Sequence, residues 1–226
     1  MASVTYGVIW DVDGTLVDTA EMHFDAWKRT CQELGRDFSR ADFAATFGRR
    51  NPEIMKELFG DKFDSHEVDA IGQRKEDYYR DAVRKLGVAL LPGAADLLEG
   101  LRKAGFRQAI GSSAPRENVD LILQHTQTTS FFSGISSSED SERGKPDPQV
   151  FLIAAEHMGV APRHCLVLED AVAGVEAARN GGMRSIAITF VGHHPADKLR
   201  AAGADRVVKT LAEVTADQVK ELLAAT

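Results

Sequence analysis

The residues best suited to chemistry are acidic and polar side chains that directly follow short apolar runs. Asp11 and Asp13 follow the first run, and Ser112 and Ser113 follow a run near the middle of the chain. Oxygen donors suit Mg²⁺, which binds through one or two carboxylates together with substrate phosphate. A carboxylate such as Asp11 can also act as a nucleophile, and one placed two residues later can transfer protons. The pattern therefore indicates chemistry on a phosphate group.

Three further residues fit the same chemistry. Glu169 and Asp170 follow another apolar run and add two carboxylates. Lys145, in the stretch Gly-Lys-Pro-Asp-Pro, offers a positive charge to phosphoryl oxygens and to crowded carboxylates. Each feature alone is more often a solvated turn, a helix cap or a surface lysine. Their occurrence together in this order favours one shared site.

The apolar runs predict strands that would bring these residues together. They alternate with helical patterns from about residue 91 onward, which is typical of a parallel sheet with helices on both faces. Because ligands bind beyond the carboxyl ends of such strands, the polar residues should meet at one edge. Strands are expected at 4–10, 108–111, 165–168, 185–189 and 206–208, and helices at 93–103, 115–125, 148–158, 171–180, 195–202 and 215–224. The predicted fold is α/β, with a doubly wound, mainly parallel, Rossmann-like sheet.

Residues 18–90 break this alternation, since they contain helical patterns and no convincing strand. Asp18 with Glu21 three residues later predicts a capping box at the start of the first helix. The expected organisation is therefore an α/β core of residues 1–17 and 91–226, with a small all-helical cap, 18–90, inserted after the first acidic motif.

Composition excludes several classes of function. The chain has 226 residues, is 43% hydrophobic and carries a formal net charge of −7. Its apolar content excludes a disordered chain, and no apolar run reaches the roughly 18 residues of a membrane span. A negative charge without a Lys/Arg cluster argues against a nucleic-acid partner. The absence of a secretory signal and the presence of only two cysteines predict a cytoplasmic protein. A monomer that binds a small phosphorylated metabolite is expected.

Four motifs together resemble the haloacid dehalogenase-like superfamily: Asp11 with Asp13, Ser112, Lys145 in Gly-Lys-Pro-Asp-Pro, and the pair Glu169-Asp170. The resemblance covers essentially the whole chain, and the helical insertion is similar to that superfamily's small cap. It implies that Asp11 is the nucleophile and that Asp13 is the general acid and base. Ser112 and Lys145 would hold the phosphoryl group. The implied ligands of Mg²⁺ are Asp11, the backbone carbonyl of Asp13, Glu169 and Asp170.

The segment 18–28 is similar to β-phosphoglucomutase, which puts the resemblance in the β-phosphoglucomutase and sugar-phosphate phosphatase branch of that superfamily. This resemblance implies that Thr19 and His23 lie near the substrate at the boundary of cap and core, and it adds Lys75 of the cap. Asp13 favours phosphate-ester chemistry, because the superfamily's dehalogenases and phosphonate hydrolases lack an acid at that position.

Two departures from the mutase favour a phosphatase. The mutase holds a second, non-reacting phosphate with a Ser-Lys-Asn stretch, where this chain has Ala114-Pro115-Arg116. Arg49 and Arg50 stand slightly earlier in the cap loop than the mutase's single arginine, and a basic loop suits a phosphate or carboxylate on the substrate. With Ser113 and Arg116, they complete the expected substrate-binding residues.

These patterns predict a Mg²⁺-dependent phosphohydrolase that acts through an aspartyl-phosphate on a small phosphate ester, with a sugar phosphate favoured. A β-phosphoglucomutase-type mutase stays open, because both activities share the first half-reaction. A receiver-like phospho-acceptor without turnover is the third possibility. The helical cap and Asp13 argue against it, since a receiver needs neither.

Overall fold

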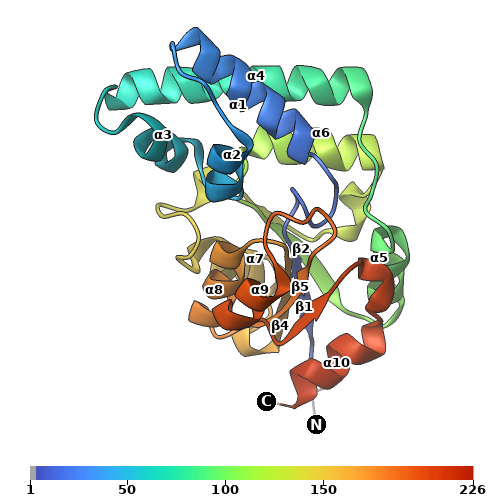
Figure 1. Ribbon diagram of the computed structural model, residues 1–226. Helices are drawn as coiled ribbons and strands as arrows, with labels where there is room; N and C mark the ends of the chain where they lie inside the picture. The colour runs from blue at the N-terminus through green and yellow to red at the C-terminus, as the bar shows by residue number, and fades with distance from the viewer. Residues whose placement is uncertain (1–3, 226) are drawn as a thin grey trace.

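A parallel sheet forms the centre of the molecule, which a computed structural model describes for residues 4–225 (Figure 1). Within those residues the sheet has six strands in the order β3-β2-β1-β4-β5-β6, and all neighbouring strands run parallel. The strands are β1 (Gly7–Trp10), β2 (Arg107–Gly111), β3 (Ile135–Ser136), β4 (Cys165–Glu169), β5 (Arg184–Ile188) and β6 (Arg206–Val208). This topology confirms the predicted doubly wound α/β sheet. Its direction of winding reverses between β1 and β4.

Helices cover both faces of the sheet, because alternate residues of a strand point to opposite faces. Val8 and Trp10 of β1 pack in a cluster with residues of α5, whereas Ile9 between them packs with residues of α7. The core helices are α5 (Ala94–Lys103), α6 (Arg116–Thr126), α7 (Gln149–Met158), α8 (Val172–Asn180), α9 (Ala196–Ala202) and α10 (Ala216–Ala224). Short 3₁₀ turns occupy η1 (Thr129–Phe131), η2 (Ser138–Asp140), η3 (Pro162–His164) and η4 (Leu211–Glu213).

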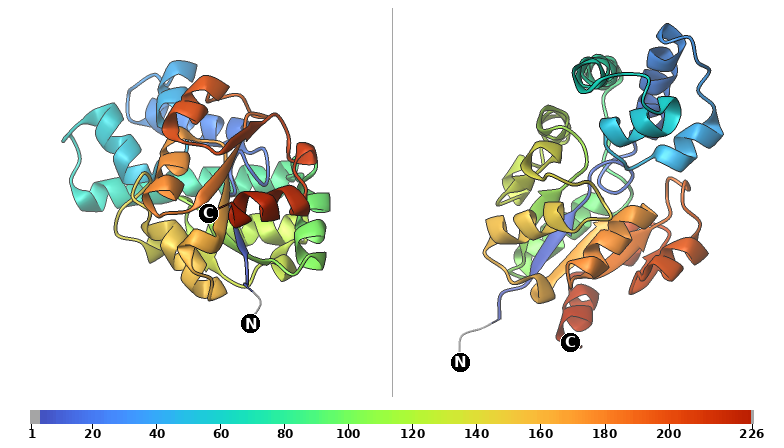
Figure 2. Two further views of the ribbon diagram at one scale, coloured as in Figure 1. Left: turned by 90° about the horizontal axis from the view of Figure 1, so that it is seen from below. Right: turned by 90° about the vertical axis from the view of Figure 1, so that its left-hand side faces the viewer.

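A second layer of helices lies beyond the carboxyl ends of the strands, on the side opposite the two termini (Figures 1 and 2). We call it the cap, and it consists of α1 (Ala20–Glu33), α2 (Arg40–Thr46), α3 (Asn51–Phe59) and α4 (Ser65–Leu86). The cap has its own apolar cluster, which includes Trp27 and Phe43. The chain segments that enter and leave it run side by side, since Leu91 N donates to Leu16 O at 2.9 Å. The boundaries at residues 18 and 90 stay a prediction.

The observed core elements agree closely with those expected. Four strands and six helices lie within one residue of their predicted bounds, while β1 begins three residues later, at Gly7. The two-residue strand β3 was not expected, because so short a segment carries no periodicity. The predicted capping box of Asp18 and Glu21 is wrong. Thr19 is the N-cap of α1, without a side-chain capping bond, and Glu21 instead forms an ion pair with Arg40.

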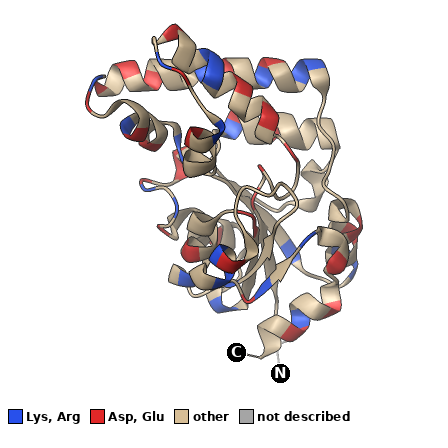
Figure 3. Cartoon of the chain, in the orientation of Figure 1, with Lys and Arg blue, Asp and Glu red and all other residues tan. Residues whose placement is uncertain are grey.

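Charged side chains of both signs are spread over the cap and the core helices (Figure 3). They alternate along α4, the long helix of the cap, whose buried side nevertheless includes Lys75, Glu76 and Arg80. None of the helices between residues 4 and 225 combines the length and the apolar character needed to cross a membrane.

Candidate active site

The carboxyl ends of β1 and β4 bring three carboxylates together. Asp11 follows β1, Glu169 ends β4, and Asp170 comes next in the chain. All three side chains are buried, and one carboxylate oxygen from each lies within 4.8 Å of the others. This edge is the point where the winding of the sheet reverses, which is the usual ligand position in open α/β sheets. We call Asp11, Glu169 and Asp170 the carboxylate cluster.

Lys145 lies buried against this cluster. Its Nζ donates to Asp11 Oδ1 and to Glu169 Oε1, each at 2.7 Å. Burial opposes the lysine's charge, but the two carboxylates outweigh burial and raise its pKa. Burial raises the pKa of Asp11 to about 8 against the attraction of Lys145. Burial also raises the pKa of Asp170 well above its usual range, with Glu169 and Asp11 adding to the effect. The cluster is short of positive charge, and its donor set fits a hard divalent cation.

Two glycines make room for the carboxylates. A Cβ atom at Gly174 of α8 would lie 1.8 Å from Glu169 Oε1, and one at Gly14 would lie 2.2 Å from Asp170 Oδ2. Gly14 also has φ of 88°, a conformation that favours glycine. Glu169 Oε2 accepts from the backbone N–H groups of Asp170 and Ala171, at 2.7 and 2.6 Å. Backbone geometry therefore fixes the cluster.

Asp13 faces the cap rather than the cluster. Its Oδ1 accepts from Thr19 Oγ1 at 2.5 Å and from the Tyr79 hydroxyl at 3.2 Å. His23 Nε2 lies 3.2 Å from the same oxygen, and its ring stacks on Tyr79 with centroids 3.9 Å apart. Burial is the largest influence on Asp13 and opposes its charge, but contacts with His23, Thr19 and Lys75 outweigh burial and lower the pKa to about 2. Asp13 is therefore held as a carboxylate.

A buried polar network continues from His23 to the core helix α6. Lys75 Nζ donates to His23 Nδ1 at 2.8 Å and to Glu76 Oε1 at 3.0 Å. Glu76 also accepts from the side-chain amides of Asn51 at 2.8 Å and Asn118 at 2.7 Å. Burial opposes the charge of Glu76, but Lys75, His23 and the two amides lower its pKa overall. The network joins the cap to α6.

Sequence reasoning missed Glu76, Asn51, Asn118 and Tyr79 as members of this network. The spacing offers one signal: Tyr79 lies four residues after Lys75 in α4, so both residues share a helical face. The other contacts join α3, α4 and α6, and no spacing along the chain predicts them.

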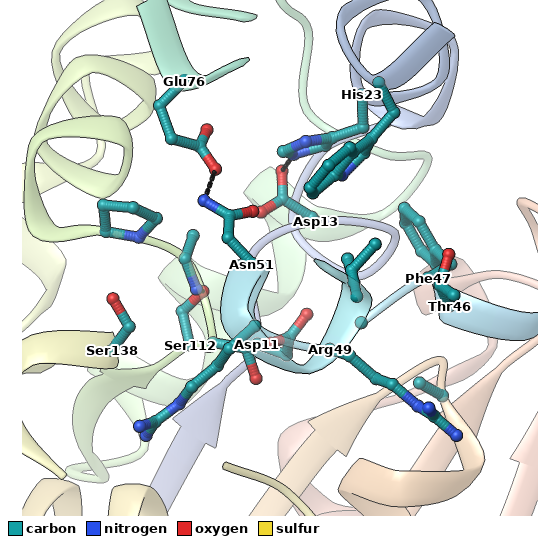
Figure 4. A pocket seen from close by; sticks show the side chains of 18 of the residues that line it. Asp11, Asp13, His23, Thr46, Phe47, Arg49, Asn51, Glu76, Ser112 and Ser138 are labelled. Carbon is teal, nitrogen blue, oxygen red and sulfur yellow. Dashed lines mark hydrogen bonds and ion pairs between the residues drawn. The ribbon is translucent and has the colours of Figure 1, made fainter. Parts of the chain in front are cut away.

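A cavity of about 220 Å³ lies between the cap and the sheet edge. Asp11, Ser112 and Ser138 lie at its core side, and His23 and Glu76 lie at its cap side (Figure 4). Ser113 also lines the cavity. Ser112 is buried, and its Oγ accepts from Ala114 N at 3.1 Å. Polar groups from both layers thus face one shared cavity.

The three predicted substrate-binding arginines differ in position. Arg49 lines the cavity, and its guanidinium lies 3.9 Å from Glu57 on the exposed side of the cap. Arg50 also lines the cavity, but it donates to backbone carbonyls of the core. Arg116 is absent from the cavity lining, and its Nε donates to Asp120 Oδ1 at 3.1 Å on the exposed surface. The structure therefore brings two of the three to the cavity.

Fold and site together define an α/β protein with its candidate active site between a sheet edge and a helical cap. Residues 7–182 match the family described as haloacid dehalogenase-like hydrolase. The chain belongs to that family, and the resemblance found in its sequence motifs is confirmed.

Named relatives extend this result. The chain is 31% identical over 220 residues to a β-phosphoglucomutase of Bacillus subtilis (strain 168), covering 95% of this chain and 93% of the relative. It is 27% identical over 221 residues to a phosphorylated carbohydrates phosphatase of Thermotoga maritima, covering 96% and 99%. A crystal structure of β-phosphoglucomutase from Clostridium difficile shares the fold, with a TM-score of 0.87, 23% identity and 98% coverage of both chains.

Proposed function

We propose that the protein is a Mg²⁺-dependent phosphohydrolase for a small phosphate ester, with a sugar phosphate the favoured class. The observation that carries the proposal is the position of Lys145, whose ammonium joins Asp11 and Glu169 at 2.7 Å beneath the cavity. Asp11 as nucleophile and Asp13 as acid–base carboxylate line the cavity beneath the cap, and the positive charge of Lys145 lies buried directly against Asp11. The name of the Thermotoga maritima relative, a phosphorylated carbohydrates phosphatase, supports this choice.

The carboxylate cluster would hold the magnesium ion. Its three buried carboxylates supply hard oxygen donors, and Lys145 forms ion pairs with two of them, Asp11 and Glu169. For Asp13 we propose the backbone carbonyl as ligand, because its side chain is turned towards His23. When bound, the ion would offset the charge of the phosphoryl oxygens.

The proposed reaction has two halves. In the first, an oxygen of Asp11 attacks phosphorus and the bond from phosphorus to the leaving oxygen breaks, while Asp13 gives that oxygen a proton. Asp13 must take up this proton beforehand, because its contacts hold it as a carboxylate. In the second, water attacks the aspartyl-phosphate, its proton passes to Asp13, and the bond from phosphorus to Asp11 breaks.

The charges around the cavity favour hydrolysis over transfer between sugar positions. A mutase must hold a second phosphate, and that needs cations free to bind it. Lys75 is engaged by Glu76, Arg50 by core carbonyls and Arg116 by Asp120. Among the described residues of the lining, Arg49 has the loosest ion pair, at 3.9 Å. We assign Arg49 to the substrate's leaving group.

A mutase is the second candidate. The Bacillus subtilis relative, 31% identical over 95% of this chain, is named β-phosphoglucomutase. Thr19 and His23, which match that branch in sequence, contact Asp13 in the structure, and Lys75 contacts His23. Their contacts around Asp13 suit the first half-reaction, which a mutase and a phosphatase share.

One pair of assays separates the candidates. Release of inorganic phosphate from an aryl phosphate and from a panel of sugar phosphates, with Mg²⁺ present, would support the phosphatase. Formation of glucose 6-phosphate from β-glucose 1-phosphate, with a trace of the 1,6-bisphosphate, would support the mutase. A long-lived phosphorylated Asp11 without turnover would contradict both and favour the receiver-like alternative.

A further inference from the structure

Arg50 joins the cap to a loop of the core. It is the N-cap residue of α3, yet its side chain makes no capping bond. Its Nη1 donates to the backbone carbonyl of Ser141 at 2.8 Å, and its Nη2 donates to the carbonyl of Arg143 at 3.0 Å and to the Ser141 hydroxyl. One guanidinium therefore binds two backbone carbonyls of the core loop, those of Ser141 and Arg143, for which its forked geometry is suited.

This contact has an energetic cost that a surface arginine avoids. Arg50 is half-buried, and its Nε is buried without a hydrogen-bond partner. Burial also lowers the pKa of its guanidinium. By contrast, the neighbouring Arg49 is exposed and has a 3.9 Å ion pair within the cap. Because buried donors without partners are costly, the three bonds of Arg50 to the core must offset that cost.

The loop that Arg50 holds leads directly to Lys145. Arg143, whose carbonyl accepts from Arg50, is followed by Gly144 and then by Lys145. The cap also rests on Gly144: a Cβ atom there would lie 2.2 Å from Glu53 Oε1 and 3.3 Å from Arg50 Cδ. The base of α3 thus lies against the two residues that precede the buried lysine.

We propose that Arg50 is a positioning residue for Lys145. By binding the carbonyls of Ser141 and Arg143, it holds the 141–144 loop when the cap lies on the core. Lys145 is then fixed between Asp11 and Glu169 only while the cavity is covered. The catalytic consequence of this coupling rests on the proposed phosphohydrolase function.

The first test compares steady-state kinetics with an aryl phosphate, which has a single phosphate group. Arg50→Gln should lower kcat by about 10- to 100-fold with a small change in KM, because misplacing a catalytic group by about 1 Å costs up to about 100-fold. Arg50→Lys keeps one donor group and should recover part of that loss. Arg29→Gln, which removes an exposed cap arginine paired with Glu33, is the matched control.

The second test needs no activity. Trypsin should cleave after Arg143 faster in Arg50→Gln than in wild type, whereas Lys145 is protected from trypsin by the following Pro146. Fragments 1–143 and 144–226, measured by mass spectrometry, identify the cut. Arg29→Gln should match wild type, and urea unfolding confirms that each variant folds.

The combined outcomes decide the proposal. Faster cleavage after Arg143 together with a lower kcat supports it. Unchanged cleavage overturns it, as does a higher KM at constant kcat, which would place Arg50 on the substrate. A wild-type protein that hydrolyses no phosphate ester would refute the proposed function, while the cleavage rates would still show whether Arg50 holds the loop.

Discussion

The pKa values of the carboxyl groups on the two sides of the cavity are shifted in opposite directions. On the core side, burial raises the pKa of Asp11 to about 8, and Lys145 pairs with two members of the carboxylate cluster, Asp11 and Glu169. On the cap side, burial also opposes ionisation of Asp13, but His23, Thr19 and Lys75 lower its pKa to about 2. Glu76 is likewise stabilised as a carboxylate by Lys75 and two amides.

The two groups of carboxylates therefore differ in whether residues of this chain compensate their negative charge. The carboxylate cluster needs a further cation before all its members can ionise at neutral pH. The cap-side network pairs its carboxylates with groups of this chain. We therefore expect the cluster to serve metal binding and chemistry, and the network around Glu76 to stabilise the cap on the core.

Replacing Asp11 should have the largest effect on activity. Asp11→Asn should lower kcat by at least about 10³-fold, because it removes the nucleophile. The free energy of unfolding of the metal-free protein should change by less than about 1 kcal/mol, because burial already favours the neutral carboxyl group. Phosphate release and urea unfolding measure the two effects. Asp25→Asn, an exposed cap position, is the control, and substantial activity in Asp11→Asn would refute the assignment.

Asp13→Asn should have the next largest effect. General acid–base groups contribute about 10²- to 10⁴-fold, so kcat should fall by that factor. Since hydrolysis of the aspartyl-phosphate loses its base, phosphorylated protein should accumulate and be visible by intact mass after acid quenching. Wild-type steady-state rates in this variant would show that Asp13 transfers no proton in the rate-limiting steps.

Glu76→Gln should destabilise the fold by about 3 kcal/mol at pH 7, because it leaves Lys75 as a buried charge without its carboxylate. The pKa of Glu76 is lowered in the folded state, so its stabilising contribution is present above its unfolded value of about 4.3. That contribution is lost as the pH falls through the folded value. The difference in unfolding free energy between wild type and variant should therefore narrow from pH 6 to pH 3.

Urea unfolding at several pH values measures this difference. Asp69→Asn, at an exposed position of the same helix, should change stability by less than about 0.5 kcal/mol. A loss in Glu76→Gln that is equally small would mean that the network does not hold the cap.

The last prediction replaces no side chain and concerns the pH dependence of Mg²⁺ binding. The pKa of Asp11 is raised to about 8 and that of Asp170 lies well above its usual range, so metal binding at pH 7 must release protons. The Kd for Mg²⁺ should fall as the pH rises from 6 to 8, by about 10-fold per proton released per pH unit. Calorimetry in two buffers with different heats of ionisation measures the protons. Binding without proton release would show that the carboxylate cluster is already ionised at pH 7, and would contradict its contrast with Asp13 and Glu76.

The sequence predicts the core side of the cavity better than the cap side. Asp11, Ser112 and Glu169 are placed by the ends of strands, which short apolar runs reveal, so their convergence could be expected. Partners such as Asn51 and Asn118 come from different layers, and their contacts with Glu76 depend on how the cap lies on the core. Tertiary packing decides such contacts, and local patterns do not record it.

Contacts between cap and core also explain two local features that the sequence did not predict. The capping box at α1 was expected from Asp18 and Glu21, but the Thr19 hydroxyl at the N-cap donates to Asp13 instead. The expectation that Arg50 binds substrate stays a prediction: Arg50 lines the cavity, and the structure adds its bonds to the core loop that precedes Lys145. In both cases a contact between cap and core replaces the local preference of the residue.

The most direct test follows the phosphoryl group through one turnover. Wild-type protein with Mg²⁺ is mixed with a limiting amount of aryl phosphate, quenched in acid at intervals and analysed by intact mass and peptide mapping. We expect a transient phosphoryl group on the peptide that contains Asp11, followed by release of inorganic phosphate at the rate at which this intermediate disappears. Phosphate release without any phosphorylated peptide, or a phosphoryl group on another residue, would contradict nucleophilic catalysis by Asp11.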